Sequence, residues 1–174
     1  AANRSWRLLD IAQARHRMSA WPEYDPSAAF IHERIVAADE VDAYGHVNHV
    51  VYLAWLDACS WRHAETIGLG LDYAVATQRG LAVRSVVLDY LGAARLGDAI
   101  AVRTWVVAND GRLLGARRFD VLCGVRRVLR ARINYVMLDL TTLKPTRMTE
   151  PFRVRLPAVP PVVTKAAQET ARAQ

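Results

Sequence analysis

The chain has 174 residues, 52% of them apolar, and this length and composition favour one domain with a sizeable core over two domains. No apolar run approaches the length that crosses a bilayer, so no membrane span is expected. The net charge of +6 fits a phosphate-bearing partner. No helix-turn-helix, zinc-finger or stacking-aromatic motif accompanies the charge, so nucleic acid is not an expected partner.

The two cysteines, Cys59 and Cys123, each lie in an apolar context and are too few for a disulfide framework. The first residues contain arginines but no apolar stretch of the kind found in secretory signals. These two features favour a reducing, cytoplasmic location.

Residues 1–29 are expected to form a leader, in which Ser5 caps a short helix over 6–18. Two prolines after this helix break it. The alternation of side chains then predicts a strand over 30–42, which ends in a loop at Gly45.

The pattern from His49 to about Ile67 is helical, and its first three turns are apolar on nearly every side. A helix of this kind lies in a core, where other elements cover it. Its later turns carry charged and polar side chains, which indicates that this end reaches solvent. Gly68 is expected to end the helix.

Four strands follow, over 81–91, 98–110, 113–124 and 126–140, all rich in aliphatic and aromatic residues. Short connectors, among them the hairpin signal NDGR, predict antiparallel neighbours. Arginines in the last two strands alternate with apolar residues, which predicts either a solvated outer face of the sheet or a phosphate site. The remaining residues, 151–174, are expected to form a C-terminal tail.

Together these elements predict an α+β fold over residues 30–150, in which an antiparallel sheet curls around one helix. One sheet cannot fully cover a helix that is apolar on nearly every side. A second copy of the sheet would help to cover it, so a dimer is expected.

Titratable and polar side chains are concentrated just before this helix, at Asp42, His46, Asn48 and His49. Asn48 is a good N-cap. The first N–H groups of a helix, together with its dipole, can hold a carbonyl oxygen that gains negative charge. A nearby carboxylate can attack an acyl group or deprotonate a water. The motif therefore supplies the parts for acyl transfer to water.

The stretch DAYGHVNHVVYLAWLDAC, from Asp42 to Cys59, resembles the signature of hotdog-fold thioesterases. This is the group of the 4-hydroxybenzoyl-CoA and acyl-CoA thioesterases, and the stretch is similar also to the pattern of plant acyl-ACP thioesterases. Asp42, Gly45 and Tyr52 have the spacing of the family.

Further positions extend the resemblance. His46 and Asn48 match the His-Val-Asn variant of the signature, and His49 stands where some bacterial members carry a histidine. Many members have a second aspartate two positions before the catalytic one, whereas this chain has Glu40. Whether Glu40 supports the site is left open by the sequence.

The resemblance implies a hotdog fold that binds a thioester at a dimer interface, without a metal or a redox cofactor. It assigns Asp42 as nucleophile or general base, and the backbone amides near His49 and Val50 as the group that polarises the thioester carbonyl. The expected substrate is an acyl-CoA thioester, cleaved to free acid and CoA, with arginines near the CoA phosphates. The expected assembly is a homodimer or homotetramer.

Most other motif residues have two interpretations each. His49 orients water or substrate, or it assists proton transfer. His46 takes part in the chemistry or only fills the loop, and Asn48 positions water or only caps the helix. Tyr52 packs in the core or contacts the acyl group, and Gly45 is grouped with Val50 and Tyr52 as substrate-binding.

Several other functions are weighed against acyl-CoA hydrolysis. An acyl-carrier-protein thioesterase fits the His-Val-Asn pattern and the basic charge. A non-catalytic acyl-binding module is disfavoured by the intact Asp42, and a hotdog dehydratase by the lack of its His and Gly-Pro loop with a helix Glu. A metal site at Asp42, His46 and His49 has no recognised zinc spacing and no fourth ligand.

Overall fold

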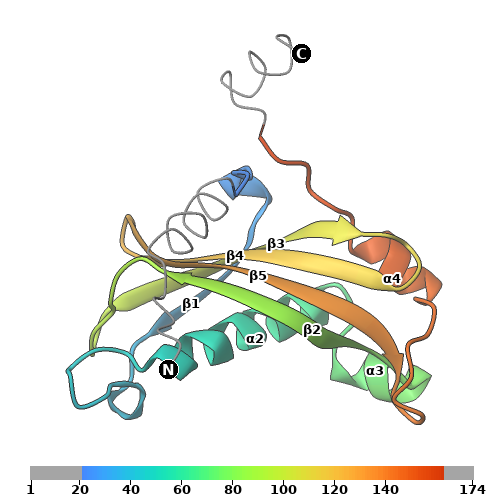
Figure 1. The fold of residues 1–174 in the computed structure, drawn as a ribbon, viewed down its shortest axis with the longest axis horizontal. Helices are drawn as coiled ribbons and strands as arrows, with labels where there is room; N and C mark the ends of the chain where they lie inside the picture. Colours follow the sequence, from blue (N-terminus) through green and yellow to red (C-terminus); the bar gives the residue numbers. More distant parts are fainter. Residues whose placement is uncertain (1–20, 163–174) are drawn as a thin grey trace, which may run out of the picture. The chain divides into compact units, whose positions relative to one another are not determined.

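Five antiparallel strands form one sheet in the order β1-β3-β4-β5-β2. The computed structural model describes residues 21–162, and residues 25–160 form the compact unit that contains this sheet (Figure 1). The strands are β1 (Phe30–Ile35), β2 (Arg79–Tyr90), β3 (Ala99–Asn109), β4 (Leu114–Cys123) and β5 (Arg126–Asp139). The predicted α+β class and hotdog arrangement are confirmed, while the predicted helix over 6–18 lies outside the described residues.

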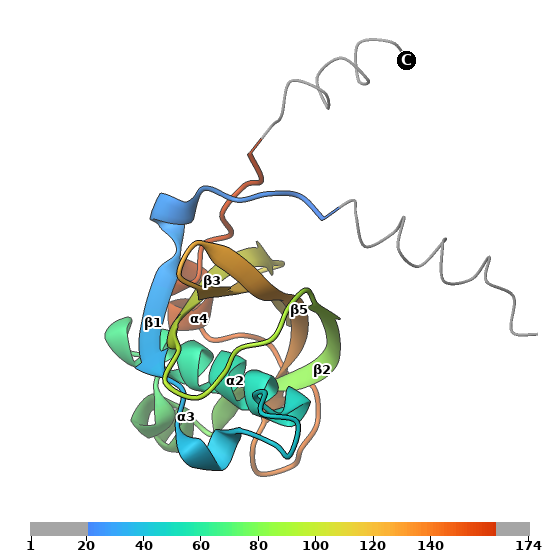
Figure 2. The same cartoon turned by 90° about the vertical axis from the view of Figure 1, so that its left-hand side faces the viewer.

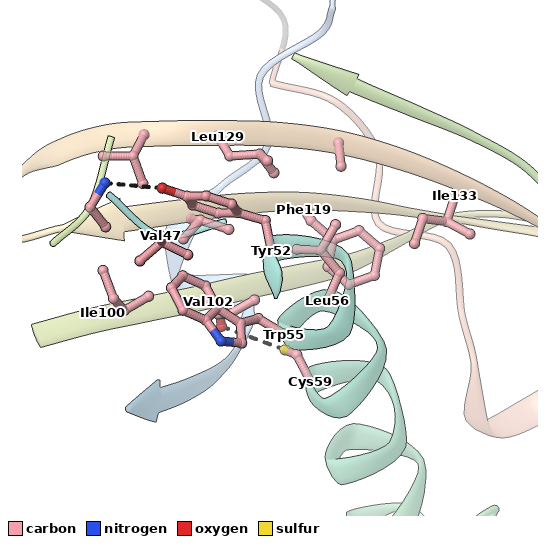
Figure 3. Close-up of a cluster of buried hydrophobic side chains, with 14 of the residues drawn as sticks. Val47, Tyr52, Trp55, Leu56, Cys59, Ile100, Val102, Phe119, Leu129 and Ile133 are labelled. Carbon is pink, nitrogen blue, oxygen red and sulfur yellow. Dashed lines mark hydrogen bonds between the residues drawn. The ribbon is translucent and has the colours of Figure 1, made fainter. Parts of the chain in front are cut away.

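The long helix α2 (His49–Thr66) lies along the concave side of the sheet, which curls around it (Figure 2). One face of α2 is buried against sheet residues such as Phe119 and Val102, and Figure 3 shows this packing. The buried helix residues are Tyr52, Trp55, Leu56 and Cys59. The opposite face is open, since Val50 is 61% and Trp61 41% exposed. A single chain therefore covers only one side of α2.

The sequence prediction of a strand over 30–42 is too long. β1 ends at Ile35, because a short 3-10 turn, η2 (Ala38–Glu40), follows it. The Glu40 carboxylate accepts the N–H of Ala37 at 2.9 Å, and this contact closes the turn. A second 3-10 turn, η1 (Pro26–Ala28), comes just before β1.

Two short helices were not predicted. α3 (Leu71–Thr77) follows Gly70 and ends at Gln78, which has a φ of 52°. α4 (Glu150–Arg155) begins the segment that the sequence assigned to the tail. Phe152 and Leu156 are four residues apart, so they share one face and pack in a second cluster with Leu69, Val106, Met137 and Met148.

The connection from β2 to β3 corrects a topology prediction. Its shortness predicted antiparallel neighbours, but β2 pairs with β5 and β3 pairs with β1. Residues 91–98 link the two strands, and their backbone is held by the segment before α2: Val47 N–H donates to Ala94 O at 2.9 Å, and Gly97 N–H to Val36 O at 3.1 Å. These bonds place the connection beside the start of α2.

The other two connections are confirmed as hairpins. Asp110 Oδ1 accepts the N–H groups of the three residues Arg112, Leu113 and Leu114, at 2.8, 2.8 and 2.9 Å. Gly111 and Gly124 have φ values of 65° and 59°, a region that favours glycine. Within the described residues, no helix is long and apolar enough to cross a bilayer.

The arginines of β4 and β5 do not all lie on a solvated face. Arg118 is 4% exposed and lies 3.4 Å from Asp120, and Arg130 lies 2.9 Å from Asp89. Arg117 points the other way, toward α2, because neighbouring residues of a strand face opposite sides of the sheet.

Candidate active site

The loop that carries Asp42 is closed by its own backbone. An isolated bridge pairs Val41 with Val47. Inside it, Asp42 N–H donates to His46 O at 2.9 Å, and Gly45 N–H donates to Asp42 O at 3.0 Å. Gly45 has a φ of 74°, a conformation that a residue with a side chain rarely adopts. The role of Gly45 shown here is therefore to make the turn.

The Asp42 carboxylate is half-buried in this loop. Its Oδ1 accepts the N–H of Tyr44 at 2.9 Å, so Asp42 does serve as a turn residue. No partner is found for Oδ2 among residues 21–162. One carboxylate oxygen thus orients the side chain, and the other is free for chemistry.

Asn48 is the N-cap of α2, as one interpretation of the sequence predicted. Its Oδ1 accepts the N–H of Val50 at 3.0 Å. The Val50 amide is therefore already engaged, which removes it from the expected pair of carbonyl-polarising groups. The N–H of His49 has no acceptor in the described part of the chain, so it is the amide that remains for a substrate oxygen.

The two histidines point to different surroundings. His46 Nε2 lies 3.4 Å from the guanidinium of Arg95, in the connection between β2 and β3. The His49 side chain is exposed, and its backbone oxygen accepts the hydroxyl of Tyr90 at 3.0 Å. No three His, Cys, Asp or Glu side chains within residues 21–162 are placed to hold a metal, so Asp42, His46 and His49 form no such site.

Tyr52 is part of the core. It is 2% exposed, and its hydroxyl accepts the N–H of Ala94 at 3.0 Å (Figure 3). Its ring packs edge-on against Tyr90, with centroids 5.8 Å apart. These contacts support the packing interpretation, and they tie α2 to the connection that lies beside the Asp42 loop.

Glu40 supports the site, a role that the sequence left open. Its carboxylate binds the guanidinium of Arg34 and accepts the ring N–H of Trp55 at 2.8 Å. Burial opposes ionisation of Glu40, but the Ala37 N–H, Trp55 and Arg34 outweigh it and lower its pKa. The backbone oxygen of Glu40 accepts the N–H of Asn48 at 2.9 Å. Glu40 therefore holds both ends of the Asp42 loop.

A buried polar group under the second half of α2 was not predicted. Arg117 contacts His63, and Ser60 lies near Tyr135. The strand alternation around Phe119 places Arg117 on the core side, and this signal was available in the sequence. The sequence prediction instead treated the arginines of β4 and β5 as one set, either on a solvated outer face or at a phosphate site.

A family model described as the thioesterase-like superfamily matches residues 36–166, which is most of the chain. Among curated proteins no match was found. Three solved structures that are similar to this chain share less than 25% identity with it, and they show a common fold.

The protein SAV2348 from Staphylococcus aureus, solved in complex with CoA, has a TM-score of 0.72 at 16% identity, over 82% of this chain and 90% of that chain. Slr0204 from Synechocystis, a 1,4-dihydroxy-2-naphthoyl-CoA thioesterase, has a TM-score of 0.67 at 17% identity, over 74% and 95%. YbaW from Escherichia coli, a probable thioesterase, has a TM-score of 0.64 at 22% identity, over 73% and 96%.

Proposed function

The chain belongs to the thioesterase-like superfamily, and on this premise we propose that it hydrolyses an acyl-CoA thioester to a free acid and CoA. The observation that carries the proposal is the presence of a carboxylate and a free amide within the same short segment at the start of α2. Asp42 has one unpartnered oxygen within the described residues, and the His49 N–H at the start of α2 has no acceptor there. Asp42 lies inside the loop closed by the Val41–Val47 bridge, and His49 follows that bridge at the first position of α2.

The amide and the carboxylate have different roles in the proposed reaction. The His49 N–H, at the positive end of α2, would bind the thioester oxygen as it gains negative charge. In one route, Asp42 attacks the carbonyl carbon, the C–S bond breaks, the thiolate leaves with the electron pair, and water hydrolyses the acyl-aspartyl anhydride. In the other, Asp42 takes a proton from water, the water oxygen attacks, and the proton passes to the leaving sulfur. Label in Asp42 after a single turnover in oxygen-labelled water would indicate the first route.

CoA is proposed as the carrier of the acyl group for two reasons. The similar structure from Staphylococcus aureus holds CoA, and in this chain the exposed Arg95 lies beside His46 at the edge of the Asp42 loop. An acyl carrier protein also presents phosphate and acidic groups. The rates of hydrolysis of acyl-CoA and acyl-carrier-protein thioesters with the same acyl chain must therefore be compared. If thioesters of acyl carrier protein are hydrolysed faster, the carrier protein replaces CoA as the proposed carrier of the acyl group.

We also propose a homodimer built on the open face of α2. Val50 and Leu53 on this helix are 61% and 37% exposed, and Val83 of the edge strand β2, on the same side of the sheet, is 53% exposed. Val87 of the same edge strand, which is paired with Arg132 on the opposite side of the sheet, is 41% exposed. Exposed apolar side chains next to an unpaired strand edge are typical of an interface. The site would then lie beside a surface shared by two copies.

The first test is Asp42→Asn. Asparagine can still accept the Tyr44 N–H through Oδ1, so the loop should keep its shape, while kcat should fall by roughly 10²–10⁴-fold. The control is Asp39→Asn, an exposed carboxylate three positions earlier, which should keep its rate. Unchanged turnover in Asp42→Asn would mean that the carboxylate is misassigned.

His49→Ala retains the backbone amide and should slow hydrolysis less than Asp42→Asn.

A further inference from the structure

A cavity of about 120 Å³ lies under the second half of α2 and is not lined by Asp42. Its walls come from α2, the sheet and α4, and include Ser60, Trp61, Arg117, Tyr135 and Phe152. A single water takes about 30 Å³ of liquid, and an engineered cavity of about 150 Å³ binds benzene. The cavity is therefore large enough for a short piece of a small molecule.

The guanidinium of Arg117 lines this cavity without an acid to neutralise it. Arg117 is 6% exposed, and its Nη1 donates to Nδ1 of His63 at 2.8 Å. In the part of the chain that the structure describes, no carboxylate forms an ion pair with Arg117; Asp57, which lines the same cavity, forms none. An unpaired charge is costly to bury, so a site for an anion would account for its presence.

His63 leaves this charge in place and does not compensate it. Because Nδ1 accepts a hydrogen bond from Arg117, the ring is neutral. Burial, together with the nearby guanidinium, lowers the pKa of His63 to about 4. The ring stacks on Phe30, with centroids 5.0 Å apart, which fixes its orientation. His63 therefore orients Arg117 and uses only part of the donor capacity of its five N–H groups.

Two hydroxyl groups line the same cavity beside Arg117. The Ser60 hydroxyl donates to Leu56 O at 3.0 Å, and its oxygen lies 3.4 Å from the hydroxyl of Tyr135. Burial raises the pKa of Tyr135, which keeps its proton. Since the Ser60 proton goes to Leu56 O, Tyr135 donates its own proton to Ser60 Oγ, and the N–H groups of Arg117 are the donors left for a ligand; an ionised carboxylate consists of acceptors only.

We propose that this cavity binds a carboxylate at the far end of the acyl group, so that the preferred substrates are half-thioesters of dicarboxylic acids. This inference rests on the proposed function. Asp57, Trp61 and Val83 are exposed and line the cavity as well as the open faces of α2 and β2. The acyl group enters from that surface, which the proposed dimer would share between two copies.

The test compares two series of CoA thioesters of equal chain length. Adipyl-, suberyl- and sebacyl-CoA carry the far carboxylate, while hexanoyl-, octanoyl- and decanoyl-CoA lack it. We expect kcat/KM of the wild type to favour the dicarboxylic member by on the order of 10²-fold at the chain length that reaches Arg117. Arg117→Met, of similar size but neutral, should reverse this ratio. Arg132→Met removes an arginine from the opposite face of the sheet and should leave the ratio unchanged.

Binding provides a readout that does not depend on turnover. The dissociation constants of both series are measured with Asp42→Asn, with and without Arg117→Met; the neutral Arg117→Gln serves if the methionine variant does not fold. If dicarboxylic thioesters bind more tightly and Arg117→Met abolishes this preference, the carboxylate site is supported. A wild type that shows this binding preference but hydrolyses none of the thioesters would overturn only the proposed function. Hydrolysis without a dicarboxylic preference at any length, or a preference for hydroxyaryl thioesters, would overturn the inference alone.

Discussion

Glu40 shows how one carboxylate can hold together the residues around the proposed site. Its side chain joins η2, β1 and α2 through the Ala37 N–H, Arg34 and Trp55. The guanidinium of Arg34 also lies over the Trp55 ring, 4.6 Å from its centroid. Three elements that are separate in the sequence are therefore held at the base of the Asp42 loop.

Glu40→Ala should lower the free energy of unfolding by about 1–3 kcal/mol, because Trp55 and Arg34 lose their acceptor in a partly buried place. Hydrolysis should slow as well, since the loop loses its anchor. Urea unfolding and kcat measure the two effects. Glu33→Ala, at an exposed glutamate on β1, is the control; equal stability of the two variants would contradict this role of Glu40.

His63 gives the fold a dependence on pH. Its pKa is about 4 in the folded chain and 6.5 when free, so between these values the unfolded chain binds a proton that the folded chain does not. Stability should therefore fall as the pH is lowered from 6.5 toward 4, by at most about 1.4 kcal/mol per pH unit and by less for a partly exposed ring.

The measurement is urea unfolding between pH 7 and pH 4.5 for the wild type and His63→Gln. The glutamine oxygen can still accept from Arg117 but does not titrate, so the variant should lose the His63 part of the slope. Parallel curves for the two proteins would show that His63 is not the source.

At the scale of elements, the start of α2 combines capping and chemistry. Asn48 accepts the Val50 amide and leaves the His49 amide, which we propose as the group that binds the substrate oxygen, without an acceptor in the described residues. The helix is held at the same end by the Tyr90 hydroxyl on His49 O and by Tyr52, whose hydroxyl accepts from Ala94. The free amide is therefore presented by a helix end that cannot easily shift.

Two substitutions at Asn48 should separate these functions. Asn48→Ala removes the cap and should cost about 1 kcal/mol of unfolding free energy. Asn48→Asp keeps a capping oxygen and should retain stability, but its negative charge opposes the developing charge on the substrate oxygen, so kcat should fall roughly tenfold. Thermal unfolding and steady-state rates distinguish the two variants. Full activity of Asn48→Asp would contradict the proposed position of the thioester carbonyl at the start of α2.

At the scale of the whole molecule, β2 is an edge strand of the sheet and lies next to the open face of α2. Val87→Lys puts a charge on this edge and should convert the proposed dimer to a monomer with reduced kcat/KM. Val125→Lys is the matched control, because Val125 is fully exposed in the turn between β4 and β5. Sedimentation velocity would show the assembly; an active wild-type monomer would contradict the shared site.

The sequence by itself determined the features that depend on near neighbours. The bounds of α2, its cap at Asn48, the hairpins at Gly111 and Gly124 and the family signature around Asp42 follow from residues a few positions apart. The hydrogen bonds that make these features link residues close in the chain, such as Asn48 with Val50. Local pattern is therefore sufficient to predict them.

Only the tertiary structure decided the features that join distant residues. The strand order, the bond between Val47 and Ala94, the anchoring of Trp55 by Glu40 and the contact of Arg117 with His63 all depend on how the sheet curls around α2. Strand propensity and the alternation of side chains predict which face of a strand is buried. They do not predict which strands pair, because pairing is set by packing against the whole core. For the same reason, the structure alone showed that the Val50 amide is occupied and that a buried guanidinium lines a cavity.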